Sequence, residues 1–159
     1  MRITEKDKEY MREAIRLADE SVKNGGGPFG AVIVKDGEII AGSANSVTRD
    51  NDPTAHAEVN TIRQACKKLG TFDLSDCIIY TSCEPCPMCL GAIYWARIKK
   101  IYYGNTKKDA ADINFADDFI YKELEQPKEE RFVPLISLLR NEALKTFRAW
   151  EAKQDKVEY

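Results

Sequence analysis

The fold of this chain is decided by the stretch CIIYTSCEPCPMCLGAIYWARIKKIYYG, residues 77–104. Its first part, residues 77–82, is short, apolar and β-branched, which predicts a buried strand. A helix is expected over residues 86–97, and residues 100–104 are again β-branched and aromatic, which predicts a second strand. A strand–helix–strand unit of this kind pairs its strands in parallel and packs its helix on the sheet.

Two further helices are predicted upstream of this unit. From residue 5 to residue 23 the apolar side chains recur at helical spacing, and Thr4 can cap the first turn. A second helix is expected over residues 55–69, because its apolar side chains also share one face and Gly70 follows its end.

A β-hairpin is predicted between these two helices. Residues 29–35 and 38–45 are β-rich runs joined by Asp36-Gly37, a dipeptide that favours a two-residue hairpin turn. Near the carboxy terminus, residues 109–126 are expected as broken helix and loop. Residues 132–136 predict an edge strand, since Pro134 cannot donate a ladder hydrogen bond.

The elements together predict an α/β fold. A last helix is expected around Phe147 and Trp150, which share an apolar stripe. The expected architecture is a three-layer α/β/α sandwich with a mixed sheet of about five strands. A chain of 159 residues suits one ordinary domain over residues 1–159, large enough to bury a core and form a pocket.

The composition limits the function. Charged residues make up 31% of the chain but nearly cancel, leaving a formal net charge of -2, which does not favour nucleic-acid binding. No apolar run approaches the roughly 20 residues of a membrane helix, so we expect a soluble, cytoplasmic protein with no membrane partner. Five cysteines, an odd number, suit a reducing compartment and metal or redox chemistry better than a disulfide framework.

The strongest chemical signal combines His56-Ala57-Glu58 with Pro85-Cys86-Pro87-Met88-Cys89, both expected at helix starts. One imidazole and two thiolates bind Zn2+ readily, and a fourth position left for water is typical of a catalytic zinc site. A helix amino terminus also lowers thiol pKa and favours the thiolate that a metal requires. The pattern therefore predicts zinc held by His56, Cys86 and Cys89.

Other interpretations of the cysteines remain open at this point. A lone histidine or a lone Cys-x-x-Cys is as often structural or redox-active as catalytic. Cys83, Cys86 and Cys89 also resemble the start of an iron–sulfur run, although Ala92 stands where the fourth cysteine would be. Cys83 is the alternative fourth ligand for a closed, structural zinc site.

The pairing of His-x-Glu with Pro-Cys-x-x-Cys is the signature of zinc-dependent nucleobase deaminases, so the chain resembles the cytidine-deaminase superfamily. Residues 27–34, 51–59 and 80–97 are similar to bacterial guanine deaminases, as are residues 119–123 and the last two residues. The resemblance implies a cytidine-deaminase-like fold, bound zinc and hydrolysis of guanine to xanthine and ammonia. Glu58 would then move protons between the attacking water, a ring nitrogen and the departing amine.

The resemblance also implies substrate contacts. Asn45 and the backbone of Ala57 would hold the purine. Phe29 would flank the ring, and Asp117, the second catalytic residue, would accept from the N–H groups of the purine. Tyr159 would reach an active site. Each position has a structural alternative: a turn at Asn45, core packing at Phe29, a cap or exposed carboxylate at Asp117, and a frayed terminus at Tyr159.

The assembly and the substrate leave alternatives open. The resemblance implies a homodimer that exchanges carboxy-terminal segments, which would place Tyr159 in the partner's site. Ala116 departs from the related pattern, in which an acidic residue could stand before Asp117-Asp118. The resemblance therefore leaves open which of the two carboxylates, Asp117 or Asp118, faces the substrate. Guanosine and cytosine deaminases share the motif, and so do tRNA adenosine deaminases, whose RNA should require a basic surface. A non-catalytic, zinc-stabilised interaction module is the remaining class.

Overall fold

The computed structural model describes residues 2–159. The chain divides into two compact units, one ending at Asp118 and the other spanning Phe119–Tyr159, and each is described by itself. No helix in the described residues is long and apolar enough to cross a membrane.

The first unit contains a mixed four-stranded sheet. Its strands are β1 (Gly30–Lys35), β2 (Glu38–Ala44), β3 (Cys77–Cys83) and β4 (Ile101–Asn105). Their order is β2-β1-β3-β4, with β1 antiparallel to both neighbours and β3 parallel to β4. The parallel pair predicted from residues 77–104 is therefore confirmed.

The predicted hairpin is confirmed as β1 and β2. Asp36 and Gly37 have φ angles of 50° and 79°, the left-handed conformation that a tight hairpin turn requires at both central positions. The turn brings Lys35 opposite Glu38 and so fixes the register of the two strands.

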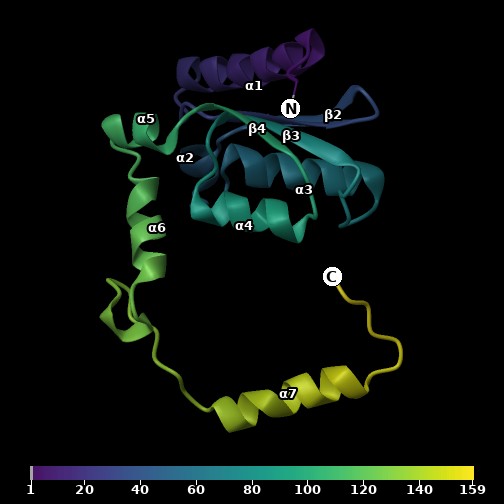
Figure 1. Ribbon diagram of the computed structural model, residues 1–159, viewed down its shortest axis with the longest axis vertical. Helices are drawn as coiled ribbons and strands as arrows, with labels where there is room; N and C mark the ends of the chain where they lie inside the picture. Colours follow the sequence, from purple (N-terminus) through teal and green to yellow (C-terminus); the bar gives the residue numbers. More distant parts are fainter. Residues whose placement is uncertain (1) are drawn as a thin grey trace. The chain divides into compact units, whose positions relative to one another are not determined.

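Helices cover both faces of the sheet, as the three-layer prediction requires. Figure 1 shows α1 (Glu5–Lys23) on one face and α3 (Ala57–Leu69) with α4 (Pro87–Trp95) on the other. Side chains of β1 alternate between these layers. Ile33 packs with Ala65 of α3 and Ile93 of α4, whereas Val32 packs with Ala14 of α1. The central strands are thus buried on both sides, which explains their nearly continuous apolar sequence.

The predicted boundaries of α1 are also confirmed. The Thr4 side chain accepts from the Asp7 N–H at 3.1 Å, and the Asp7 carboxylate accepts from the Thr4 N–H at 2.7 Å, a reciprocal capping box. The helix crosses β1 at Gly30, where an added Cβ would lie 2.2 Å from the Ala14 carbonyl oxygen. Only glycine permits this close approach between helix and sheet.

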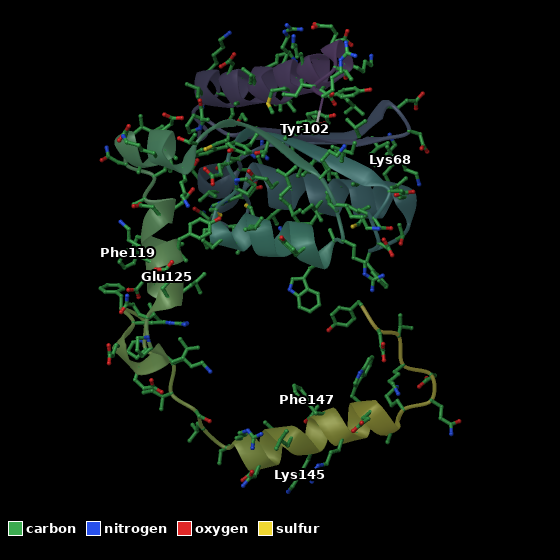
Figure 2. All side chains as sticks on the ribbon, viewed as in Figure 1. Lys68, Tyr102, Phe119, Glu125, Lys145 and Phe147 are labelled. Atoms are coloured by element: carbon green, nitrogen blue, oxygen red, sulfur yellow. The ribbon has the colours of Figure 1, made fainter. Side chains whose placement is uncertain are left out.

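The last part of the first unit is helical, and so is most of the regular structure of the second unit. The predicted broken helix over residues 109–126 is confirmed as α5 (Lys107–Asp112) and α6 (Asp117–Glu125). The short helix η1 (Lys128–Glu130) and the predicted last helix, α7 (Arg140–Ala152), follow. Neither α6 nor α7 has a buried residue, and Phe147, labelled in Figure 2, is 73% exposed.

The strand predicted over residues 132–136 is wrong. The Phe132 N–H donates to the Glu123 carboxylate at 2.6 Å, and the Leu135 N–H donates to the Lys128 carbonyl at 3.0 Å. The described residues of the second unit include no strand with which this segment could pair. The sheet therefore has four strands and not about five.

Candidate metal centre and cavity

Three predicted metal ligands lie together where two helices begin. His56 is the N-cap of α3 and Cys86 the N-cap of α4, and the extended backbone at both positions aims their side chains past the helix ends. Cys89 follows in the first turn of α4. The His56 Nδ1 atom lies 3.5 Å from the Sγ atom of each cysteine, and the three ligand atoms lie within 4.8 Å of one another.

These distances fit a tetrahedral zinc ion. With Zn–S of about 2.3 Å and Zn–N of about 2.05 Å, a tetrahedral angle separates nitrogen from sulfur by about 3.6 Å. Cys83 is not in the ligand group, because its thiol donates instead to the Thr106 carbonyl at 3.7 Å. His56 is the only histidine in the chain. The centre thus has three protein ligands, which favours an open, catalytic site over a closed structural one.

The electrostatics of the centre favour metal binding at Cys86. Its pKa is lowered to about 4, first by a hydrogen bond with the Cys89 thiol and then by His56 and the Cys89 N–H. The pKa of His56 is raised, chiefly by its hydrogen bond with Cys86. The pKa of Cys89 is raised because its thiol donates a hydrogen bond to Cys86 and because its side chain is buried. A metal would replace that shared proton, since both sulfurs ligate as thiolates.

Glu58 lies beside the metal ligands without joining them. It is in the first turn of α3 and only 5% exposed. Its Oε1 atom accepts a hydrogen bond from the Thr81 hydroxyl at 2.6 Å. His56 and Glu58 are only two residues apart, but both stand at the start of α3 and both line one cavity.

A cavity of about 220 Å³ opens in front of these groups. It is lined by Gly27, Phe29, Asn45, Val47, Thr48, His56, Glu58, Cys83, Glu84, Cys86, Phe115 and Asp117. The wall is mostly apolar with a few polar groups, the usual character of a small-molecule site. Among the predicted substrate residues, Phe29, Asn45 and Asp117 line the cavity, whereas Ala57 is fully buried and does not. Tyr159 belongs to the second unit, and its role stays a prediction.

Asn45 is held in place by a network around the loop after β2. Its side-chain oxygen accepts from the Val47 N–H at 3.1 Å. Asn45 therefore also turns the chain after β2, which was the structural alternative to substrate binding. The Asn60 amide nitrogen lies 3.1 Å from the Ala44 carbonyl and 2.9 Å from the Ser46 hydroxyl. Asn60 therefore ties this loop to α3, the helix that carries Glu58.

Asp117 faces the cavity at the start of α6, whereas Asp118 does not line it. Burial is the main cause that raises the pKa of Asp117, and the nearby Cys86 raises it further. The structure thus distinguishes two neighbouring carboxylates that the sequence leaves equivalent.

Four further residues line the cavity without having been predicted from the sequence: Phe115, Val47, Thr48 and Glu84. The Phe115 ring meets the Phe29 ring edge to face, with centroids 4.9 Å apart and an interplanar angle of 87°. This aromatic pair forms one wall. Its signal in the sequence was weak, because an aromatic residue between two short helices more often packs in a core.

Residues 4–105 match the model of the cytidine and deoxycytidylate deaminase zinc-binding region. The chain belongs to this family. The guanine deaminase of Bacillus subtilis is 58% identical over 151 residues, which cover 94% of this chain and 97% of that protein. Its X-ray structure superposes with a TM-score of 0.92 at 57% identity, covering 96% and 98% of the two chains. Zinc is therefore the metal of the centre formed by His56, Cys86 and Cys89.

Two other relatives show the range of the family. The tRNA-specific adenosine deaminase of Bacillus subtilis is 44% identical over 98 residues, which cover 62% of this chain and 61% of that protein. A solved complex with 2,6-diaminopurine superposes with a TM-score of 0.66 at 29% identity, covering 94% of this chain and 83% of that one.

Proposed function

We propose that this chain hydrolyses guanine to xanthine and ammonia. The observation that carries the proposal is one cavity in which Glu58 and the zinc ligands meet an aromatic wall, an amide and a second carboxylate. Near full-length similarity to a guanine deaminase and the likeness to a protein that binds a diaminopurine support a purine as the substrate.

The reaction needs one nucleophile and several proton transfers. When bound, zinc lowers the pKa of water and so supplies hydroxide at neutral pH. Glu58 takes the proton of the attacking water and gives it to the ring nitrogen beside the attacked carbon. It then takes the second proton of that water, from the newly formed C–OH group, and transfers it to the amino group, which leaves as ammonia. Water and guanine thereby yield xanthine and ammonia, with no other reactant.

Three side chains of the cavity wall select the substrate. The Asp117 carboxylate accepts from N–H groups of the purine, and Asn45 pairs with a polar ring edge. Phe29 packs against the ring, with Phe115 edge-on to it. An analogue that lacks these polar groups leaves buried atoms unpaired, which can lower kcat/KM by as much as about 10⁴-fold.

The substrate assignment is tested by comparing kcat/KM for guanine, guanosine, cytosine, cytidine and adenine, measured as ammonia release with and without a chelator. Guanine should be preferred, and chelation should stop its turnover. A clear preference for guanosine or cytosine overturns the substrate while leaving the deaminase chemistry. Absence of turnover with every base and nucleoside favours a non-catalytic zinc module.

We further propose that residues 1–159 work as one deaminase domain, in a homodimer that exchanges carboxy-terminal segments and places Tyr159 in the partner's site. Large apolar side chains of the second unit support this, since Phe132, Leu138 and Phe147 are between 73% and 81% exposed. Apolar groups of this size gathered on one segment are typical of an interaction surface. Five free cysteines suit a reducing, cytoplasmic location.

Exchange can be tested by complementation between two inactive chains. One chain carries Glu58→Gln with an intact carboxy terminus, and the other keeps Glu58 but lacks Glu158 and Tyr159. If each site takes its terminus from the partner, half of the randomly mixed dimers hold one complete site. Co-expression should then restore about one quarter of wild-type activity. Activity equal to the mean of the two parents would exclude exchange.

A further inference from the structure

The Thr81 hydroxyl holds one oxygen of the Glu58 carboxylate, to which the Cys89 thiol is also hydrogen-bonded. Its Oγ1 atom lies 2.6 Å from Glu58 Oε1, a short distance typical of a hydroxyl that donates to a carboxylate. Both side chains are buried, with exposed fractions of 1% for Thr81 and 5% for Glu58. Thr81 is not among the residues that line the cavity, so it acts from behind the carboxylate.

The backbone around Thr81 is rigidly placed. Thr81 lies in the central strand β3, opposite Ala31 of β1 and Tyr103 of β4. Glu58 instead belongs to α3, on one face of the sheet. The hydrogen bond therefore fixes a helix side chain against the middle of the sheet, independently of the metal ligands.

We propose that Thr81 is a positioning residue for deamination: its hydroxyl fixes Glu58 through Oε1 and so leaves Oε2 directed to the reacting groups. The inference rests on the proposed role of Glu58 as the group that moves protons. A glutamate side chain has three rotatable bonds, and proton transfer requires the carboxylate within about 3 Å of its partner. Without Thr81 the buried carboxylate would sample other orientations.

A hydroxyl suits this position because it can donate to Oε1 both before and after Glu58 takes a proton on Oε2. Thr81 has one hydrogen and two acceptors in reach, Glu58 Oε1 at 2.6 Å and the Cys83 carbonyl at 3.0 Å. While Glu58 is a carboxylate, Thr81 donates to it. While Glu58 carries the proton taken from water on Oε2, Oε1 is still an acceptor and Thr81 continues to donate to it. The carboxyl group thus keeps its orientation through the reaction.

The test compares Thr81→Val, which keeps the shape and removes the hydroxyl, with Thr81→Ser, which keeps the hydroxyl. The matched control is Thr61→Val, because Thr61 is equally buried but its hydroxyl donates to the Ala57 carbonyl at 2.6 Å. The zinc-loaded full chain is assayed for kcat, KM, zinc content and Tm, with guanine as substrate.

Loss of a hydrogen bond to a charged group should lower kcat of Thr81→Val about 10- to 100-fold, with KM changed less than about threefold and one zinc per chain retained. Thr81→Ser should keep kcat within about threefold of wild type, and Thr61→Val should lower Tm but not kcat. If Thr81→Val is too unstable to assay, Thr81→Ala replaces it.

Three results would overturn the proposal. The first is unchanged kcat in Thr81→Val. The second is an equal loss in Thr81→Ser or Thr61→Val, because that pattern follows from packing alone. The third is a wild-type chain that deaminates none of the bases or nucleosides named above, and this result is distinct because it rejects the proposed function itself.

Discussion

Replacing Glu58 with glutamine should remove most of the turnover while leaving the fold and the zinc site intact. The two side chains have the same shape, and the glutamine carbonyl can accept the hydrogen bond that Thr81 donates at 2.6 Å. The glutamine amide then occupies the position of Oε2. An amide nitrogen has no basic lone pair, so it cannot take a proton from water.

The magnitude follows from the burial of the site. Glu58 is 5% exposed, so bulk water cannot readily replace it as a proton acceptor. General acid–base groups contribute about 10²- to 10⁴-fold, which corresponds to about 3 to 5.5 kcal/mol in activation free energy. We therefore expect kcat for guanine to fall by that factor, measured as ammonia release, with zinc content and Tm close to wild type.

Glu58→Ala provides the comparison. This variant should lose a similar factor in kcat but also lower Tm, because it opens a buried void and leaves Thr81 only the Cys83 carbonyl as an acceptor. Two outcomes would refute the reasoning. Zinc loss in Glu58→Gln would make Glu58 a metal ligand, and a decrease in kcat of less than about tenfold would mean that another group moves the protons.

The remaining predictions concern the metal, the second carboxylate and the chain end. Wild type should bind one zinc per chain and Cys86→Ala much less, whereas Cys66→Ala, which is outside the ligand group, should retain it in metal analysis. Asp117→Asn should lower kcat/KM for guanine, though less than Glu58→Gln does. Deleting Glu158 and Tyr159 should lower activity without greatly lowering Tm, because terminal residues make few core contacts; unchanged kinetics would reject this role.

Each half of the metal centre was predictable because its information is local in the sequence, and the known family signature joins the two halves. Cys86 and Cys89 are one helical turn apart, and Pro87 between them marks the first turn of a helix. His56 and Glu58 similarly stand at one helix start. Short spacings of this kind fix geometry before any tertiary contact is known. The hairpin at Asp36-Gly37 was predictable for the same reason.

The errors and omissions arise where the geometry depends on distant partners. Residues 132–136 have the composition of a strand, but strand formation requires a neighbouring strand, and the described second unit offers none. The sequence indicates only that Thr81 is a β-branched residue in a strand. Its contact with Glu58 exists only because α3, which packs on β1 and β2, starts within hydrogen-bond reach of β3. Phe115 likewise gains its place from contact with Phe29, 86 residues earlier in the sequence.

The zinc ligands all lie within the region that the family model matches, whereas part of the cavity wall lies beyond it. The metal ligands stand at the starts of α3 and α4, within residues 4–105, where the family model matches. Phe115 and Asp117 line the cavity from beyond that region. Similarity to the tRNA-specific adenosine deaminase extends over 98 residues, whereas that to the guanine deaminase extends over 151. Changes beyond the family region can therefore alter the cavity wall without moving any residue that holds zinc.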